Sequence, residues 1–289
     1  YSAHRTAALS IATDRRSAAR VLSLAAASTS DYQGFAWQAK IGLSSPAGVL
    51  YGSTALVSTR TLLPLCRATS MESMELSPRL HGARRVLIIP ARRRSTRLPD
   101  KLLLRETGKT VLQHTYETAC LCRRADAVVV AVDDNELARE ARQFGAPVMM
   151  TSPQCASGTD RVAEAARRLP TADLIVNLQG DEPDMDPRLL DQLFEDLAGS
   201  PAASMATLAT PIRDEEALND PSCVKVVCSA QGTALYFSRA PIPFVREWDP
   251  SLLEVDPPLF LQHLGVYAFR RQTLLGFSNA HPGSLAPLA

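Results

Sequence analysis

A cluster of cationic side chains follows a short apolar run and could bind a polyanion. Residues 86–89, Val-Leu-Ile-Ile, predict a buried strand of a parallel sheet, and we expect Pro90 to end it. The loop that follows carries Ser95, Thr96 and five cations, which are Arg92, Arg93, Arg94, Arg97 and Lys101. Open α/β sheets bind ligands at the carboxyl ends of their strands, where hydroxyl and amide groups can donate hydrogen bonds to phosphate oxygens. A solvated basic loop is the alternative interpretation.

An acidic loop follows a second apolar run further along the chain. Residues 174–178 predict a strand that leads into Gln179-Gly180-Asp181-Glu182-Pro183. Because the carboxyl ends of parallel strands share one edge of a sheet, we expect Asp181 to face the cationic loop. Mg²⁺ in proteins takes one or two carboxylates and completes its shell with substrate phosphates, so Asp181 is a candidate metal ligand. Alternatively, Asp181 caps the helix expected near Pro187, and Glu182 either supports the metal site or is solvated.

A third candidate segment is Ser157-Gly158-Thr159-Asp160-Arg161. Small residues at the start of a helix allow a ligand to approach the backbone amides and the positive end of the helix. Ser and Thr are also ordinary helix N-caps, so a purely structural role is equally compatible with this segment.

The order of predicted elements indicates an α/β fold. Strands are expected at residues 86–89, 127–132, 148–150 and 174–178, and helices at residues 110–123, 136–144, 159–169 and 187–197. Such alternation favours three layers around a mainly parallel, Rossmann-like sheet. No GxGxxG sequence follows the first strand, which disfavours a dinucleotide site. Further strands are expected at residues 203–209, 225–228, 233–237 and 264–269, as antiparallel additions in the second half.

The composition excludes several classes of protein. The 289 residues carry a formal net charge of +1 and are 46% hydrophobic, which allows a sizeable core and gives no general attraction to nucleic acid or membranes. No apolar run approaches the roughly 20 residues of a membrane-spanning helix. The six cysteines form no CxxC pair, so we expect reduced thiols in a cytoplasmic protein rather than a zinc site or a disulfide framework.

The first part of the chain differs from the rest. Residues 1–70 contain seven Arg or Lys but only two acidic residues, and they show no alternation of strands and helices. We expect residues 1–84 to form a disordered or non-native extension. An organellar transit peptide, and therefore an organellar location, is the alternative.

Several motifs occur in a fixed order along the remaining chain. They are IIPAR, STRLPDK, SGTDR, NLQGDEP, ALYFSRAPIP and QHLGVYAF. Together they resemble the 3-deoxy-manno-octulosonate cytidylyltransferase family of sugar nucleotidyltransferases, over about residues 85–280. The resemblance implies that residues 85–289 form a nucleotidyltransferase domain and that the enzyme is a homodimer.

The resemblance also implies roles for particular residues. It assigns CTP to Arg92, Ser95, Arg97, Lys101, Ser157, Gly158, Thr159 and Arg161. It assigns the acidic sugar to Gln179, Arg239, His263 and Tyr267, and the magnesium ion to Asp181. The expected catalytic residues are Arg97, Lys101 and Asp181. An arginine suits the sugar carboxylate because a guanidinium can bind it in a bidentate manner. Alternatively, His263 is a structural histidine and Tyr267 a core or interface aromatic.

The implied reaction is nucleotidyl transfer. The anomeric hydroxyl of 3-deoxy-manno-octulosonate (Kdo) would attack the α-phosphorus of CTP, with Mg²⁺ as cofactor, giving pyrophosphate and CMP-Kdo for lipopolysaccharide-type envelope synthesis. Neither nucleic acid nor a membrane is an expected partner. The alternatives are transfer to another sugar acid or a sugar phosphate, and a non-catalytic relative that binds nucleotide.

Three features depart from the family pattern. The family usually has Gly where Asp100 stands, and a carboxylate there would repel a triphosphate unless it turns outward or pairs with a neighbouring arginine. The family often has His where Cys155 stands. After a segment like residues 283–285 the family continues to a second metal-binding aspartate, so we expect a domain truncated at its C-terminus. The alternatives are an inactive chain, a fragment and a truncated gene product.

Overall fold

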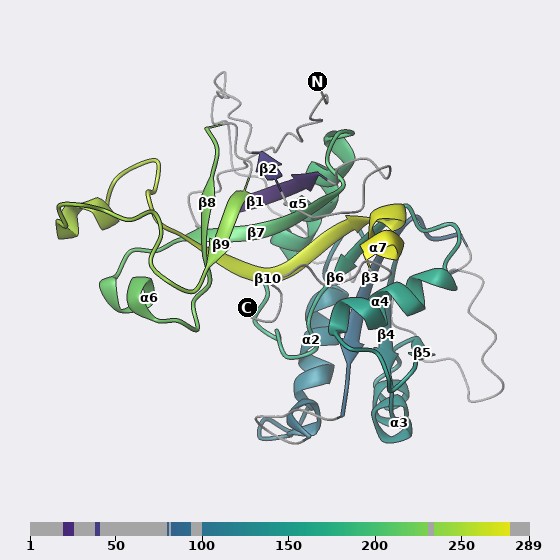
Figure 1. Cartoon of the computed structure of the whole chain (residues 1–289). Coiled ribbons are helices and arrows are strands. Elements are labelled where there is room, and N and C mark those ends of the chain that lie inside the picture. Colours follow the sequence, from purple (N-terminus) through teal and green to yellow (C-terminus); the bar gives the residue numbers. More distant parts are fainter. Residues whose placement is uncertain are drawn as a thin grey trace, which may run out of the picture.

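The computed structural model describes residues 20–25, 38–40, 80, 82–93, 100–230 and 234–277 of the chain. Within these ranges a ten-stranded mixed sheet has the main order β2-β1-β7-β10-β6-β3-β4-β5, and β8 and β9 branch from β10 (Figure 1). None of the helices in these ranges has the length and hydrophobicity needed to cross a membrane.

Four strands form the parallel half of the sheet. They are β3 (Arg85–Ala91), β4 (Ala127–Val132), β5 (Val148–Met150) and β6 (Leu174–Asn177). β3 lies at the centre of this half, where Ile88 pairs with Val129 of β4 and with Asn177 of β6. All four strands point the same way, so the loops after β3 and β6 leave the sheet at one edge.

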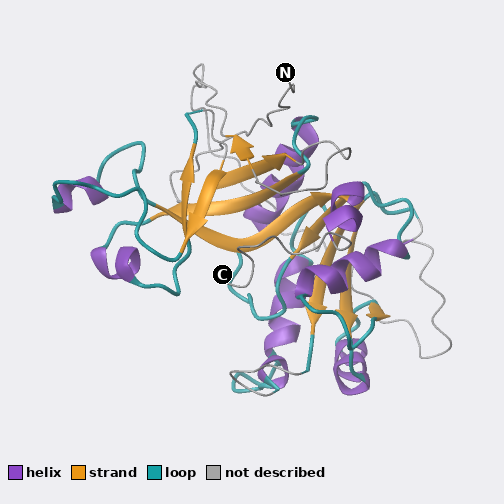
Figure 2. Cartoon of the chain, in the orientation of Figure 1, coloured by secondary structure: helices purple, strands orange, loops and turns teal. Residues whose placement is uncertain are grey.

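Helices connect these strands and cover both faces of the sheet (Figure 2). They are α2 (Val111–Ala119), α3 (Asn135–Gln143), α4 (Gly158–Arg167) and α5 (Pro187–Gly199). Each begins after a Thr, Asp or Ser whose side chain accepts a hydrogen bond from a backbone N–H of the first turn. α4 packs on β3, β4 and β6, whereas α5 packs on β6, β7 and β10. The expected three-layer α/β fold is therefore confirmed.

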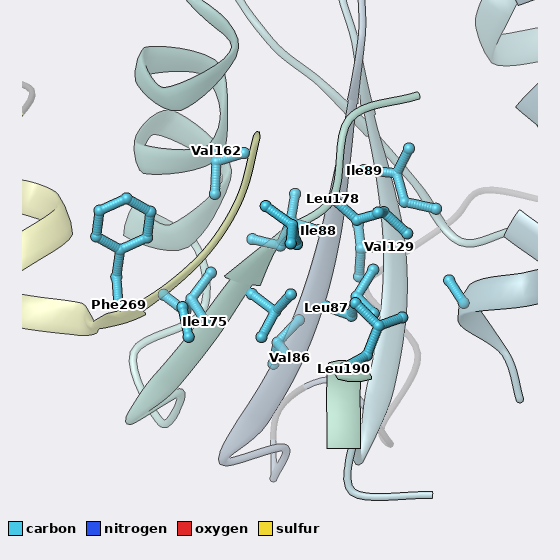
Figure 3. Close-up of a cluster of buried hydrophobic side chains, with 14 of the residues drawn as sticks. Val86, Leu87, Ile88, Ile89, Val129, Val162, Ile175, Leu178, Leu190 and Phe269 are labelled. Carbon is cyan, nitrogen blue, oxygen red and sulfur yellow. The ribbon is translucent and has the colours of Figure 1, made fainter. Parts of the chain in front are cut away.

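The core lies between these layers. Val86, Leu87, Ile88 and Ile89 of β3 have no exposed surface. Figure 3 shows Ile88 on the side of Val162 of α4 and Leu87 on the side of Leu190 of α5, as expected when alternate residues of a strand face opposite sides. A continuous apolar run is thus explained by helices on both faces.

The second half of the sheet is antiparallel, as expected. Its strands are β7 (Met205–Pro211), β8 (Lys225–Cys228), β9 (Ala234–Ser238) and β10 (Leu261–Arg270). The long strand β10 pairs with both β7 and β6 and so joins the two halves. Short helices flank these strands: α6 (Glu215–Asn219), η2 (Pro250–Leu253) and α7 (Arg271–Phe277).

Pro90 does not end the first strand of the parallel half, contrary to expectation. β3 continues through Pro90, which pairs with Ala131, to Ala91. The carbonyl of Ile88 accepts a hydrogen bond from Leu178 on the β6 side, and alternate residues of a strand direct their polar groups the same way. Pro90 therefore faces a position beyond the end of β6, where the missing N–H has no ladder partner to lose.

Helix α2 ends four residues before the predicted boundary. The backbone N–H groups of Arg123 and Arg124 donate to Oδ1 of Asp191 in α5, at 2.7 and 2.8 Å. This contact lies 67 or more residues away in sequence, so helical periodicity could not reveal it.

Two segments of the N-terminal 84 residues join the sheet, although no strand was expected there. β1 (Arg20–Ala25) pairs with β7, and β2 (Gln38–Lys40) pairs with β1, both antiparallel. Most of residues 1–84 lies outside the described residues, and the division of the chain at residue 84 stays a prediction.

Candidate functional site

The acidic tip of β6 and the end of the cationic loop meet at one edge of the sheet. Lys101 begins the short helix η1 (Lys101–Leu103), and its Nζ donates to Oδ2 of Asp181 at 2.8 Å. Both side chains remain accessible, at 43% and 41% exposure. An exposed ion pair of this kind contributes only about 0–1 kcal/mol to stability, so a ligand can readily replace it.

Gly180 allows this close approach. A Cβ at position 180 would lie 3.2 Å from the carbonyl oxygen of Pro90 and 3.3 Å from the side chain of Leu102. The Gly180 carbonyl also accepts a hydrogen bond from Thr115 of α2 at 2.9 Å. Glycine thus fixes the loop of Asp181 against the end of β3.

Asp181 is the first of several carboxylates in the loop after β6. Partial desolvation and then the charge of Asp181 raise the pKa of Glu182, although that residue is exposed as a whole. The part of the chain that the structure describes contains no group of three metal-ligating side chains. A magnesium ion at Asp181 would therefore complete its shell with water or substrate oxygens, which fits the ligand preference of Mg²⁺.

The first cations of the loop differ in their surroundings. Arg92 is exposed, whereas Arg93 Nε donates to Oδ1 of Asp100 at 3.0 Å and Nη1 pairs with Oε2 of Glu136 at 2.7 Å. The carboxylate of Asp100 thus pairs with a neighbouring arginine. Two predicted CTP contacts, Ser95 and Arg97, lie outside the described residues.

Ser157 caps helix α4. Its hydroxyl accepts a hydrogen bond from the backbone N–H of Asp160 at 3.1 Å, and the Asp160 carboxylate accepts one from the Ser157 N–H at 3.0 Å. This reciprocal pair is a capping box, so the structural interpretation of Ser157 is realised. Gly158 lets the backbone of α4 approach the side chain of Gln179, because a Cβ at position 158 would lie 3.1 Å from Oε1 of Gln179.

Arg161 is buried, with 2% of its surface exposed. Its Nη2 donates to Oδ2 of Asp133 at 2.8 Å, and its Nη1 donates to Oγ1 of Thr151 at 2.6 Å. These contacts tie α4 to the ends of β4 and β5. A direct contact between Arg161 and CTP stays a prediction.

Cys155, one of the departures from the family pattern, donates its thiol to Oε2 of Glu164 at 3.2 Å. Burial and then this carboxylate raise the pKa of Cys155 to about 11, so the thiol stays protonated. A neutral thiol at this position cannot supply the charge that a protonated histidine would carry.

A polar row crosses the sheet from α4 to β10. The buried Asn177 donates to Oγ1 of Thr159 and accepts from Nε2 of Gln179, each at 3.3 Å. In the neighbouring strand, Tyr267 pairs with Asn177. Because paired residues share one face of a sheet, this row brings predicted nucleotide and sugar contacts to the same face.

His263 and Tyr267 form the far end of this row. Their rings lie 5.4 Å apart, and Nε2 of His263 is 2.9 Å from Oγ1 of Thr207. Burial lowers the pKa of His263 to about 4 and raises the pKa of Tyr267. Both side chains are therefore neutral near pH 7.

Arg239 lies just after β9, in the antiparallel half. It is exposed, and its Nη1 donates to the carbonyl of Pro221 at 2.9 Å. One residue earlier, Ser238 pairs with Lys225 of β8, the strand next to β10. The Arg239 guanidinium is thus held by the loop that precedes β8, and Val224 at the end of that loop accepts a hydrogen bond from the backbone N–H of His263.

Sequence reasoning missed Asn177 and Thr207. Both are fully buried polar residues that connect predicted site residues. The signal for Asn177 was present, since it interrupts the apolar run of residues 174–178. Thr207 carries no such signal, because threonine is common in strands.

Several known proteins are similar to this chain. The family model described as cytidylyltransferase matches residues 86–287. A 3-deoxy-manno-octulosonate cytidylyltransferase of Rhodopirellula baltica is 46% identical over 201 residues, which are 69% of this chain and 80% of the relative. The enzyme of the same name from Syntrophobacter fumaroxidans is 44% identical over 70% of this chain and 79% of its own.

A solved structure gives a similar result. It is a CMP:2-keto-3-deoxy-manno-octonic acid synthetase complexed with CTP, which is 38% identical to this chain with a TM-score of 0.65. The match covers 71% of this chain and 81% of that one.

Proposed function

The chain belongs to the cytidylyltransferase family, and we propose that it transfers CMP from CTP to Kdo. The observation that carries this proposal is the contact between Lys101 and Asp181, which sets a cation beside a carboxylate at the edge of the sheet where open α/β folds bind their ligands. The relatives named as Kdo cytidylyltransferases support the choice of sugar.

In the proposed reaction the anomeric hydroxyl of Kdo releases its proton to solvent, and its oxygen forms a bond to the α-phosphorus of CTP. The bond between that phosphorus and the bridging oxygen to the β-phosphate breaks, and pyrophosphate leaves with its electron pair. Most of the rate comes from alignment and charge neutralisation, as in other phosphoryl transfers. Lys101 neutralises phosphate charge, and Arg92 and Arg97 are proposed to share that role.

Mg²⁺ is the proposed cofactor, with Asp181 as its protein ligand. When bound, it would neutralise charge on the phosphate oxygens. Gln179 is proposed to lie between the two substrates, since it adjoins both Gly158 and Asn177.

Two of the proposed sugar contacts, His263 and Tyr267, lie at the far end of the polar row. Arg239 is proposed to bind the Kdo carboxylate, because a guanidinium offers paired donors to both carboxylate oxygens. His263 and Tyr267 would line the pocket as neutral hydrogen-bonding groups, since burial disfavours their charged forms.

Pyrophosphate release with CTP, Kdo and Mg²⁺ tests the proposal directly. Asp181→Asn should abolish release while the unfolding midpoint stays within a few degrees, because the variant removes a charge from an exposed side chain. Asp184→Asn, three residues along the same exposed loop, is the matched control and should keep the wild-type rate.

Several outcomes would redirect the proposal. Unchanged turnover in Asp181→Asn would remove this residue from the metal site. A faster reaction with another sugar acid than with Kdo would reassign the substrate. CTP binding without pyrophosphate release from any sugar would identify a nucleotide-binding relative.

A homodimer and a cytoplasmic location are further proposals, supported by the family resemblance. Light scattering during size-exclusion chromatography would measure the oligomeric state, and a mass of one chain would contradict the dimer.

A further inference from the structure

Asp100 occupies an unusual backbone conformation. Its φ of 54° and ψ of 21° lie in the left-handed helical region, and no other non-glycine residue in the described ranges has a positive φ. This conformation favours glycine, although Asp and Asn tolerate it better than most residues. An aspartate at a position that suits glycine raises the question of what its side chain does.

The Asp100 carboxylate forms an ion pair with Arg93. The guanidinium of Arg93 joins Asp100 on one side, at 3.0 Å, and Glu136 of α3 on the other, at 2.7 Å. The backbone N–H of Arg93 also donates to Oδ1 of Asp133 at 3.2 Å. Arg93 is therefore held by carboxylates and is not oriented as a phosphate ligand.

The ion pair joins the two ends of the cationic loop. Arg93 and Asp100 enclose residues 94–99, and their outer neighbours are the predicted phosphate contacts Arg92 and Lys101. The carbonyl of Asp100 accepts a hydrogen bond from Leu103 at 2.8 Å, which starts the helical turn that carries Lys101 toward Asp181.

We propose that the Arg93–Asp100 ion pair is a positioning device, which holds the backbone next to Arg92 and Lys101 so that both of these side chains can reach a bound triphosphate. The inference rests on the proposed function and deepens it by adding two residues that do not touch the substrate. Residues that are already held in place lose less conformational entropy when the nucleotide binds. The opposing effect is repulsion between Asp100 and the phosphates, which Arg93 offsets.

Asp100→Asn separates these two effects. Asparagine has the same size and also tolerates the left-handed conformation, but it cannot form an ion pair with Arg93. We expect the KM for CTP to rise about threefold to fivefold, the range that an exposed ion pair can supply, while kcat and the KM for Kdo change less than twofold. A lower KM for CTP would show that repulsion dominates and would overturn the proposal, as would an unchanged KM.

A matched control is available on α2. Lys109 and Glu117 form an ion pair of similar exposure, at 2.6 Å, that lies outside the cationic loop. Glu117→Gln should leave the KM for CTP unchanged, and a loss equal to that of Asp100→Asn would contradict a specific positioning role.

A double-mutant cycle tests the partnership itself. Arg93→Gln and Asp100→Asn should weaken CTP binding together by less than the product of their separate effects, and a fully multiplicative result would overturn the proposal. The dissociation constant for CTP is measured by titration calorimetry without sugar. This readout decides the inference even if the wild type releases no pyrophosphate, in which case only the proposed function fails.

Discussion

At the scale of single residues, the ion pairs of the protein differ in how exposed they are to solvent. Lys101 and Asp181 form an accessible ion pair at the edge where the parallel strands end, whereas Arg161 and Asp133 form an ion pair with 3% and 13% of their side chains exposed. Breaking a buried pair typically costs about 3–5 kcal/mol, so the second pair is suited to hold α4 in place. His263 differs from both ion pairs, because burial lowers its pKa and keeps its side chain neutral.

His263 gives a prediction on the pH dependence of stability. Its pKa is about 4 in the folded protein and near the ordinary 6.5 when unfolded, so the unfolded chain takes up the proton first as the pH falls. The stabilisation is complete above pH 6.5 and is lost progressively toward pH 4, by up to ~3 kcal/mol. Urea unfolding at several pH values between 7.5 and 4.5 should show a smaller loss for His263→Gln than for wild type.

A second histidine provides the control for this experiment. His114→Gln on α2 makes the same replacement at a half-buried position, and its curve is compared with that of His263→Gln. Parallel curves for wild type and His263→Gln would mean that His263 does not resist protonation in the folded state.

At the scale of elements, apolar patterns predicted most strands and helices, because both faces of the parallel half are covered and its strands read as apolar runs. The strands at residues 127–132 and 148–150 have the expected bounds. Pro90 was misjudged because its effect depends on where the neighbouring strand ends, and α2 stops early because of Asp191 in α5. These are tertiary effects that local sequence does not encode.

In the candidate site, too, features that depend on local sequence were predicted and features that depend on tertiary contacts were not. The sequence predicted that Asp181 faces the cationic loop, because parallel strands end at one edge, and the ion pair of Lys101 with Asp181 is consistent with this. The burial of Arg161 against Asp133, 28 residues away, was not predictable, since a motif names a residue without giving its depth. The sequence indicated that the Asp100 carboxylate would repel a triphosphate unless it turned outward or paired with an arginine. The structure shows that it pairs with Arg93.

Gly180 provides a prediction at this scale. Gly180→Ala should reduce stability by about 1–3 kcal/mol and lower pyrophosphate release, because the added methyl group forces the loop of Asp181 away from the backbone of Pro90. Gly276→Ala in α7 is the control, since nothing lies within 4 Å of its Cβ position, and it should stabilise the protein by up to ~1 kcal/mol. Thermal unfolding of both variants measures the difference. Equal effects would show that the contact at Gly180 is not tight.

At the scale of the whole molecule, the two halves of the sheet carry different sets of proposed substrate contacts. The parallel strands and their loops carry the proposed nucleotide and metal contacts, and the antiparallel strands carry Arg239, His263 and Tyr267. β10 pairs with β6 and brings the two sets to one face through the pairing of Tyr267 with Asn177. If this division is correct, losses in the antiparallel half should affect one substrate more than the other.

Arg239 tests that division. Arg239→Ala should raise the KM for Kdo about tenfold or more, the effect of losing a charge-assisted hydrogen bond of about 1.5–3 kcal/mol, and should leave CTP binding within about twofold. Arg213→Ala is the matched control, because Arg213 is also an exposed arginine of this half whose guanidinium donates to a backbone carbonyl, that of Leu253 at 2.6 Å. Since Arg213 carries no proposed sugar contact, its variant should keep both KM values. Equal losses for CTP and Kdo in Arg239→Ala would contradict the division, because they would place the guanidinium where both substrates depend on it.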